Sequence, residues 1–513
     1  MQKTIAIIGG GHNGLTAAAY LARAGASVTV LERLGHVGGA ALSTPAFPGV
    51  DARLSRYAYL VSLMPKQVID DLGIPLRLAR RRYSSYTPVP GTARGLLIDN
   101  GDPAATRASF ASIGAAADVD GFASVYDRTG VAARALFPTL TDPLPTQAQA
   151  KELVGADWTA LIERPIAELI EASVADDLVR GVIATDGLIG TYASMNDASL
   201  EQNRCFLYHV IGGGTGDWDV PIGGMGVVST SLEGTARAAG ARIITGAEVT
   251  GLTPDGEVTW REGNEEHRLT ADLVLCGAAP SVLSRLLGET PERVEGAQVK
   301  VNMLLTRLPR LRQQLPSEAA FGGTFHINES MTQLEAAFAA AGAGRIPDPL
   351  PADIYCHSLA DPSILGPELR AKGWQTLTLF GLHLPDRLVD SYGNDELRRL
   401  LRTAVLKTLE SVLAEPVEPL LARDGNGELC LEVKTTRDIE DALAMPGGNI
   451  FHGGLSWPWA DADDPLDTPA RRWGVDSGHD GILLCGAGAR RGGGVSGVGG
   501  HNAAKAAIEL LGL

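Results

Sequence analysis

Ile5-Ala6-Ile7-Ile8-Gly9-Gly10-Gly11-His12-Asn13-Gly14 opens the chain and decides its fold. The short β-branched run before the glycines is typical of a parallel strand that is covered on both faces. Residues 15–24 then predict an alanine-rich helix, and residues 28–31 predict a second strand that ends at Glu32. A GxGxxG spacing identifies a dinucleotide-binding fingerprint when its context is a strand, a glycine turn, a helix, a second strand and an acidic residue, in this order.

Each glycine of the fingerprint has its own physical task. Gly9 permits the tight turn, Gly11 lets the backbone approach a pyrophosphate, and Gly14 lets the helix pack closely on the strand. The helix N-terminus presents free N–H groups to the phosphates, and Glu32 can accept hydrogen bonds from the ribose hydroxyls. A second glycine pair, Gly38-Gly39, would let the chain cross the pyrophosphate of a longer cofactor, which favours FAD over NAD.

Composition excludes several classes of protein. The 513 residues include 60 acidic and 44 basic ones, a formal net charge of −16 that argues against a dedicated nucleic-acid partner. The length is that of two domains or one large composite domain. The five cysteines are widely spaced and odd in number, which argues against a disulfide framework or a redox dithiol. With no signal peptide or spanning segment, we expect a cytoplasmic protein and leave peripheral membrane contact open.

The N-terminal segments resemble the phytoene-desaturase-like FAD oxidoreductases of the amine oxidase superfamily. Residues 6–15, 32–33 and 37–41 carry this likeness. Residues 48–49 and 54–59 extend it to the branch named for a pyridine nucleotide-disulphide oxidoreductase domain, although the redox cysteine pair of that name is missing here. The resemblance implies a mixed α/β fold, with a Rossmann-like FAD-binding domain of the glutathione-reductase type and an inserted substrate domain of mixed sheet and helices.

The similarity continues along the chain. Residues 221–226 resemble the family's central glycine motif, and residues 240–249 predict a strand that brings Val249 to the adenine. Residues 481–500 predict a buried strand and a glycine-rich turn before a terminal helix at 501–511, a segment that contacts the flavin in the family. The resemblance thus implies a cofactor site made by Gly9, Gly11, His12, Asn13, Gly14, Glu32, Arg33, Gly38, Gly39, Ala40, Val249, Gly277, Gly486, Gly488, Gly494 and Val495.

The resemblance implies that three separate pieces of chain contact one cofactor, so the FAD domain should be discontinuous. We place it at residues 1–85, 215–290 and 425–513, and we place the substrate domain between these pieces, at residues 86–214 and 291–424. The first inserted piece should be helical. Apolar side chains at three-and-four spacing in residues 158–170 predict an amphipathic helix there. Its apolar face should belong to the core, with a lipid-facing or substrate-lining face as the alternative.

Few residues offer chemistry to the substrate. His452 precedes the flavin strand and is the candidate catalytic residue, although a lone histidine is more often structural. Tyr57, Trp457 and Trp459 are candidates for the substrate pocket, and ordinary packing is the alternative for the two tryptophans. The adjacent arginines at 490–491 could pair with phosphate or face solvent, and we expect solvent. No metal site is expected, because the histidines are scattered and no HxH or HExxH pattern occurs.

The resemblance implies an FAD-dependent oxidoreductase that removes two hydrogens from its substrate, with hydride transfer to flavin N5. Desaturation of a C–C bond in a largely apolar substrate is the first expectation, and oxidation of an amine or amino-acid derivative is the alternative. Flavin-dependent isomerisation and a non-catalytic lipid-binding escort role also stay open. Because no second dinucleotide fingerprint occurs, oxygen or a quinone is expected as the electron acceptor. The oligomeric state is left open, with a homodimer among the possibilities.

Overall fold

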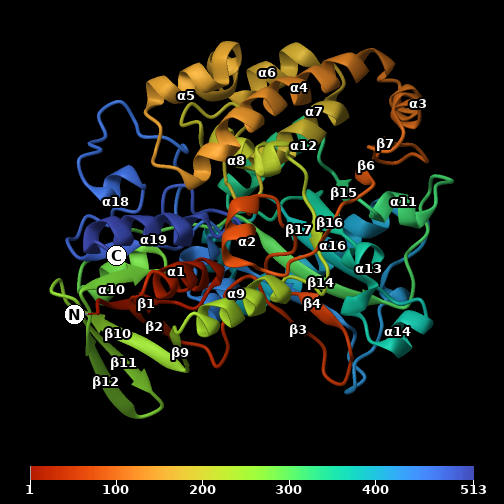
Figure 1. The fold of residues 1–513 in the computed structure, drawn as a ribbon. Helices are drawn as coiled ribbons and strands as arrows, with labels where there is room; N and C mark the ends of the chain where they lie inside the picture. Colours follow the sequence, from red (N-terminus) through yellow and green to blue (C-terminus); the bar gives the residue numbers. More distant parts are fainter. Residues whose placement is uncertain (1) are drawn as a thin grey trace.

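A computed structural model describes residues 2–513, and its first layer is a five-stranded parallel sheet. The strand order is β19-β13-β1-β2-β9, so strands from both ends and the middle of the chain lie side by side (Figure 1). This arrangement confirms the predicted Rossmann-like fold. The strands are β1 (Thr4–Ile8), β2 (Ser27–Glu32), β9 (Arg242–Thr245), β13 (Leu273–Cys276) and β19 (Ile482–Leu484).

Both faces of this sheet are covered. Ile5 and Ile7 pack under α1 (His12–Arg23), α9 (Gly226–Ala238) and α19 (Val498–Leu511). Ala6 and Ile8 face the other way, as the two-residue period of a strand requires, and pack against a three-stranded antiparallel sheet. Its strands are β10 (Ala247–Leu252), β11 (Glu257–Glu262) and β12 (Glu265–Thr270), and α10 (Pro280–Leu286) lies beside it.

The single strand predicted at residues 240–249 is two strands in the structure. Gly246 separates β9 from β10 with a φ of +71°, a left-handed conformation that side chains other than glycine rarely adopt. The turn sends β9 into the parallel sheet and β10 into the antiparallel one. Val249 therefore lies on the second sheet and not on the parallel one.

A second layer is a seven-stranded sheet in the order β18-β14-β17-β16-β15-β6-β7. The strands are β6 (Tyr83–Pro88), β7 (Gly95–Asp99), β14 (Val299–Leu305), β15 (Thr324–Ile327), β16 (Ala352–Tyr355), β17 (Gln375–Gly381) and β18 (Leu431–Lys434). The proposed domain boundary at residues 85–86 falls inside β6. The piece assigned to the FAD domain from residue 425 contains β18, which pairs with β14 of this sheet. These two boundaries move because strand pairing, which the sequence does not display, joins both segments to the seven-stranded sheet.

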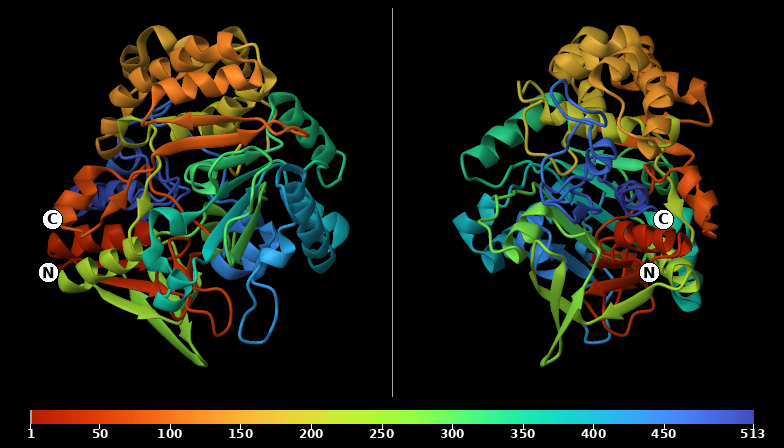
Figure 2. Two further views of the ribbon diagram at one scale, coloured as in Figure 1. Left: turned by 90° about the vertical axis from the view of Figure 1, so that its right-hand side faces the viewer. Right: turned by 60° about the vertical axis from the view of Figure 1, so that its left-hand side comes forward.

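Helices of the first insertion form a cap over the seven-stranded sheet (Figure 2). They are α3 (Pro103–Ile113), α4 (Val119–Leu136), α5 (Gln147–Val154), α6 (Ile166–Ser173), α7 (Asp177–Ala184) and α8 (Glu201–Val210). The single amphipathic helix predicted at residues 158–170 is wrong, because Arg164-Pro165 separates a π-helical turn from α6. The predicted core face is confirmed, since Trp158, Ile166 and Ile170 are buried.

Shorter elements complete the chain. The strands are β3 (Ser43–Pro45), β4 (Arg53–Ser55), β5 (Leu78–Ala79) and β8 (Val220–Pro221). The helices are α2 (Lys66–Leu72), α11 (Ser317–Phe321), α12 (Met331–Gly342), α13 (His357–Ala360), α14 (Pro367–Ala371), α15 (Arg387–Tyr392), α16 (Asn394–Val412), α17 (Thr436–Leu443) and α18 (Pro469–Arg472). Across residues 2–513, no helix has both the length and the apolar character needed to cross a bilayer.

Candidate active site

One cavity of about 710 Å³ joins the parallel sheet to the helical cap. It begins at the carboxyl ends of β1 and β2, where Gly9, Gly11 and Glu32 line it, and it continues to Phe122 and Val182 of the cap. Ligands of open α/β sheets bind at the carboxyl ends of the strands. The nucleotide fingerprint and the inserted domain therefore face the same space.

The fingerprint glycines have the geometry that their predicted tasks require. A methyl group on Gly14 would lie 2.2 Å from the carbonyl oxygen of Gly9, so the helix packs too tightly on the strand for any side chain. A methyl group on Gly11 would meet no atom within 4 Å, because it would project into open space at the N-terminus of α1. Gly14 is thus required for packing, and Gly11 leaves room for a ligand.

Glu32 lies at the end of β2 as predicted, with both carboxylate oxygens already anchored. One oxygen accepts the N–H of Gly10 at 2.7 Å and the other accepts the N–H of Leu34 at 2.8 Å. Each oxygen retains a second lone pair. The carboxylate is therefore held rigidly on the cavity wall and can still accept hydrogen bonds from two ribose hydroxyls.

The second glycine pair, Gly38-Gly39, packs against the turn that the fingerprint glycines form. The N–H of Gly38 donates to the carbonyl of Gly10 at 2.9 Å, so Gly38 supports the fingerprint without lining the cavity. Gly39 and Ala40 do line it. Gly39 has a φ of +55°, and a methyl group there would lie 3.3 Å from the Cα of Gly11. The two glycine turns therefore pack backbone against backbone.

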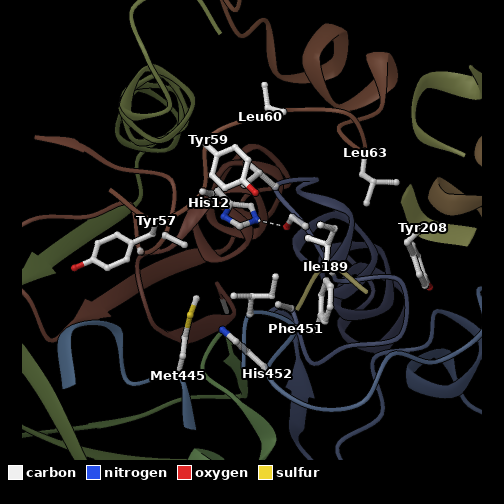
Figure 3. A pocket seen from close by; sticks show the side chains of 18 of the residues that line it. His12, Tyr57, Tyr59, Leu60, Leu63, Ile189, Tyr208, Met445, Phe451 and His452 are labelled. Atoms are coloured by element: carbon white, nitrogen blue, oxygen red, sulfur yellow. Dashed lines mark hydrogen bonds between the residues drawn. The ribbon is translucent and has the colours of Figure 1, made fainter. Parts of the chain in front are cut away.

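The C-terminal segment reaches the same place, as predicted. Gly486, Gly494 and Val495 line the cavity. His12 Nε2 lies 3.1 Å from the carbonyl oxygen of Gly494 (Figure 3), and the Asn13 amide donates to the carbonyl of Gly492 at 3.3 Å. Burial lowers the pKa of His12 to about 4, so this histidine is neutral at physiological pH.

Most other predicted cofactor residues also lie on the wall. Arg33, Val249 and Gly277 line the cavity. Gly488 is an exception among the glycines, because a methyl group there would lie 2.5 Å from the Cδ of Pro280 and the residue serves packing. Its role as a direct cofactor contact does not agree with this position.

His452, the predicted catalytic candidate, lines the cavity in an unusual state. Its φ is +65°, and its buried Nδ1 has no hydrogen-bond partner in residues 2–513. Burial, and to a lesser extent the neighbouring His12, lower its pKa to about 4. Figure 3 shows its ring on the same wall as Phe451 and Met445. A catalytic role for His452 stays a prediction. The residue lies near His12, at the end of the cavity that the fingerprint glycines line.

The predicted pocket residues divide into two groups. Tyr57 lines the cavity (Figure 3). Trp459 is fully buried in the core of the cap, stacked on Trp457 and against Trp158 with ring centroids 5.1 Å apart in each pair. The assignment of both tryptophans to the pocket is therefore wrong, because their flat apolar faces are used to attach the C-terminal loop to the helical cap.

The arginines at 490–491 do not simply face solvent as expected. Arg490 forms an ion pair with Asp464 at 2.9 Å and donates to the carbonyl of Trp459. Arg491 is 2% exposed and donates to the carbonyls of Thr139 and Asp142 at 2.8 Å and of Trp473 at 3.1 Å. Burial lowers its pKa to about 10. The sequence could not predict these contacts, because the carbonyls belong to residues distant along the chain. Through them Arg491 links three separate segments of the chain and so acts as a structural cross-link.

Replacing Arg491 by methionine should lower the free energy of unfolding by about 3 kcal/mol, because three backbone carbonyls, that of Trp473 in a buried hydrogen bond, would lose a charged donor. Arg490→Met is the matched control and should cost less, since its ion pair is partly exposed. Urea unfolding of both variants measures the difference. Equal losses for the two variants would contradict the cross-link.

Lys300 is a candidate that the sequence reading missed. It lies on β14, lines the cavity and is 1% exposed, and its Nζ has no hydrogen-bond partner in the described chain. The amine lies over the face of the Tyr59 ring, 4.2 Å from the centroid. Burial lowers the pKa of Lys300 well below its ordinary value. The sequence did contain a sign of this site, because Lys300 is the one charged residue in the apolar stretch at 299–305.

All five cysteines are buried and free. Burial raises the pKa of Cys276 to about 12, so its thiol is protonated and unreactive at neutral pH. None of the five cysteines, all of which lie within residues 2–513, lines the cavity.

Comparisons with known proteins agree with the geometry. The family model for an NAD(P)-binding Rossmann-like domain matches residues 7–66. An uncharacterized protein of Mycobacterium tuberculosis is 54% identical over 99% of this chain and 97% of its own length. The pyridine nucleotide-disulfide oxidoreductase domain-containing protein 2 of Rattus norvegicus is 30% identical over 97% of this chain and 92% of its own. The structure of cyclohexylamine oxidase from Brevibacterium oxydans covers all of both chains with a TM-score of 0.55 at 16% identity, a likeness of fold.

Proposed function

Because the chain belongs to the family of the pyridine nucleotide-disulfide oxidoreductase domain-containing protein 2, we propose that it is an FAD-dependent oxidoreductase. In this proposal it is a dehydrogenase that removes two hydrogens from a C–C bond of a largely apolar substrate. The single observation that carries the proposal is the cavity itself. It runs without interruption from the dinucleotide fingerprint to apolar side chains of the cap.

The residues present fit FAD. The open space at Gly11 leaves room for a pyrophosphate beside the N-terminus of α1, where backbone N–H groups and the helix dipole favour negative charge. The anchored carboxylate of Glu32 suits a ribose. The approach of Val495 and Gly494 to the same cavity supports a cofactor that extends beyond a nucleotide.

When bound, FAD supplies the acceptor for the hydride that leaves the substrate. The second hydrogen leaves as a proton and needs a base. Lys300 lies on the cavity wall, and burial holds its pKa well below the ordinary value, which favours the neutral amine. The Nζ lone pair of that amine can accept this proton and form an ammonium group. We therefore assign the role of base to Lys300 ahead of His452, because Lys300 lies on the seven-stranded sheet beside the substrate part of the cavity, whereas His452 lies near His12 toward the nucleotide end.

The wall beyond the fingerprint supports an apolar substrate. It is built from separate elements of the cap, the seven-stranded sheet and the loop before β19, and no single segment defines it. Six of its apolar side chains are Leu63, Phe122, Val182, Ile189, Phe380 and Phe451. Burying apolar surface against such side chains is worth about 25 cal/mol per Å². After turnover, oxygen or a quinone would remove the electrons, since the sequence holds one dinucleotide fingerprint.

The test is the visible absorption spectrum of the purified protein, followed by anaerobic mixing with a panel of alkanes and polyenes and a panel of amines. We expect a flavin spectrum that bleaches with the hydrocarbon panel. Bleaching with amines alone would move the assignment to C–N oxidation, and a shifted double bond without bleaching would indicate isomerisation. A colourless protein that does not take up FAD would refute the proposal and favour a lipid-escort role.

A further inference from the structure

A cluster of four ionisable side chains forms one end of the substrate part of the cavity. We name Asp186, His326, Glu329 and Asp353 the polar cluster. His326 Nδ1 lies 2.8 Å from Oε2 of Glu329 and 2.7 Å from Oδ1 of Asp353. Asp186, His326 and Asp353 line the cavity, and Glu329 lies fully buried behind them. Burying ionisable side chains costs free energy unless they are paired or hydrogen-bonded, so this cluster on the cavity wall suits contact with a polar part of a ligand.

Strand register places the polar cluster relative to Lys300. Lys300 on β14 pairs with Phe380 on β17, Phe380 pairs with Asp353 on β16, and Asp353 pairs with His326 on β15. Directly paired residues point to the same face of a sheet, and all four line the cavity. Three strand spacings separate Lys300 from His326, which is roughly 14 Å. A ligand that reaches both must therefore be elongated.

The pKa values of His326 and Asp186 are both raised, so these two members of the polar cluster bind protons more strongly than usual. Burial alone would lower the pKa of His326, but the carboxylates of Asp353 and Glu329 outweigh burial and raise the pKa to about 10. Burial and the nearby Asp353 raise the pKa of Asp186 to about 7. His326 is consequently an imidazolium, and its Nε2 has no partner among residues 2–513.

The unused atoms define what the polar cluster can bind. His326 Nε2–H is a free donor, and the carboxyl group of Asp186 receives no hydrogen bond from the described residues. The site holds both signs of charge, since Asp186 and Asp353 disfavour a carboxylate while His326 and the nearby Arg81 disfavour an ammonium group. An uncharged group that can both donate and accept a hydrogen bond suits such a mixed site best. The separation of 2.8 Å between His326 Nδ1 and Glu329 Oε2 is that of an N–H···O hydrogen bond.

We propose that the polar cluster binds a hydroxyl group at the far end of an elongated apolar substrate. The hydroxyl oxygen accepts a hydrogen bond from His326 Nε2, and the hydroxyl hydrogen is donated to Asp186. The bond to be oxidised then lies toward Lys300. This inference rests on the proposed function and adds the class of substrate, a long-chain or terpenoid-like alcohol.

The test measures binding to the FAD-loaded protein by the change in flavin absorbance, with octane, 1-octanol, octanoate and octylamine as probes of equal carbon number. Thermal shift gives a second readout that does not depend on the flavin. We expect 1-octanol to bind on the order of tenfold more tightly than octane, because it forms two hydrogen bonds, one of them from a charged donor. Octanoate and octylamine should bind more weakly than 1-octanol.

Asp186→Leu should remove most of this preference for the alcohol while leaving octane binding intact. The variant should fold, since Asp186 receives no hydrogen bond that would be lost. His326→Phe should act in the same direction, although it leaves two carboxylates without their partner. Asp217→Leu is the matched control, because Asp217 also lines the cavity but is paired with Arg80, and it should keep the preference.

Several outcomes would overturn the inference. These are equal binding of octane and 1-octanol, tightest binding of octanoate or octylamine, an unchanged preference in Asp186→Leu, or a stoichiometric divalent metal that His326→Phe removes. Failure of the proposed function is distinguishable from all of them. A colourless protein refutes that function, whereas a yellow protein without a preference for alcohols refutes the inference alone.

Discussion

A Gly11→Val variant should fold with unchanged stability and fail to retain FAD. Valine suits the extended backbone at this position, where φ is −69° and ψ is 170°. The new side chain meets no protein atom near its Cβ, so it costs the fold little. It would instead occupy the space at the N-terminus of α1 that a pyrophosphate needs. We expect the affinity for FAD to fall on the order of 100-fold, which corresponds to about 2.8 kcal/mol.

Equilibrium dialysis with FAD and a urea unfolding curve together measure this effect. Gly35→Val is the matched control, because Gly35 is exposed, also has open space around its Cβ, and should change neither property. Stoichiometric FAD in purified Gly11→Val protein would show that the cofactor does not pass this glycine. Loss of stability in the variant would show that Gly11 serves packing, as Gly14 does.

The nucleotide half of the site was predictable because its geometry is local. Residues 9–14 fix a turn and the start of a helix within one short segment, and Glu32 follows at the end of the next strand. A GxGxxG spacing in this context has few alternative structures. Gly9, Gly11, Gly14 and Glu32 accordingly line one cavity, whereas Gly38 lies in a supporting position behind them.

The substrate half was not predictable, because it is assembled by strand register. Lys300 and His326 are brought onto one face only by the pairing of β14, β17, β16 and β15. The same reason explains the two wrong boundaries at β6 and β18. Burial of Trp459 and Arg491 likewise depends on partners more than 300 residues away, such as Trp158 and Thr139, and composition carries no trace of such contacts.

Replacing Lys300 by methionine should nearly abolish turnover and leave FAD bound. Methionine keeps the length and apolar stem of the side chain but removes the amine that we assign as the base. Loss of a general base typically costs about 10² to 10⁴ in rate. The variant should also be more stable, by about 1–3 kcal/mol, because a buried amine without a partner disappears. A slower enzyme that is harder to unfold is an outcome that a merely structural lysine would not produce.

Lys434→Met is the matched control, since Lys434 lies on the adjacent strand β18 and forms an ion pair with Glu432 at 3.3 Å. It should keep its turnover and gain no stability. Stopped-flow reduction of the flavin under anaerobic conditions measures the chemical step, and urea unfolding measures stability. Wild-type rates of flavin reduction in Lys300→Met would assign the base elsewhere and return His452 to first place.

The pH dependence gives an independent test of the same assignment. Burial lowers the pKa of Lys300 in the folded state, so the unfolded chain binds more protons and stability rises with pH. That contribution is fully present above the unfolded pKa and is lost as the pH falls through the folded one. Flavin reduction should fall as the pH falls through the folded pKa of Lys300, because a protonated amine cannot accept the proton. In Lys300→Met, the fall at low pH should disappear both from the stability profile and from the profile of flavin reduction. A fall like that of the wild type in the variant would mean that another group titrates in this range.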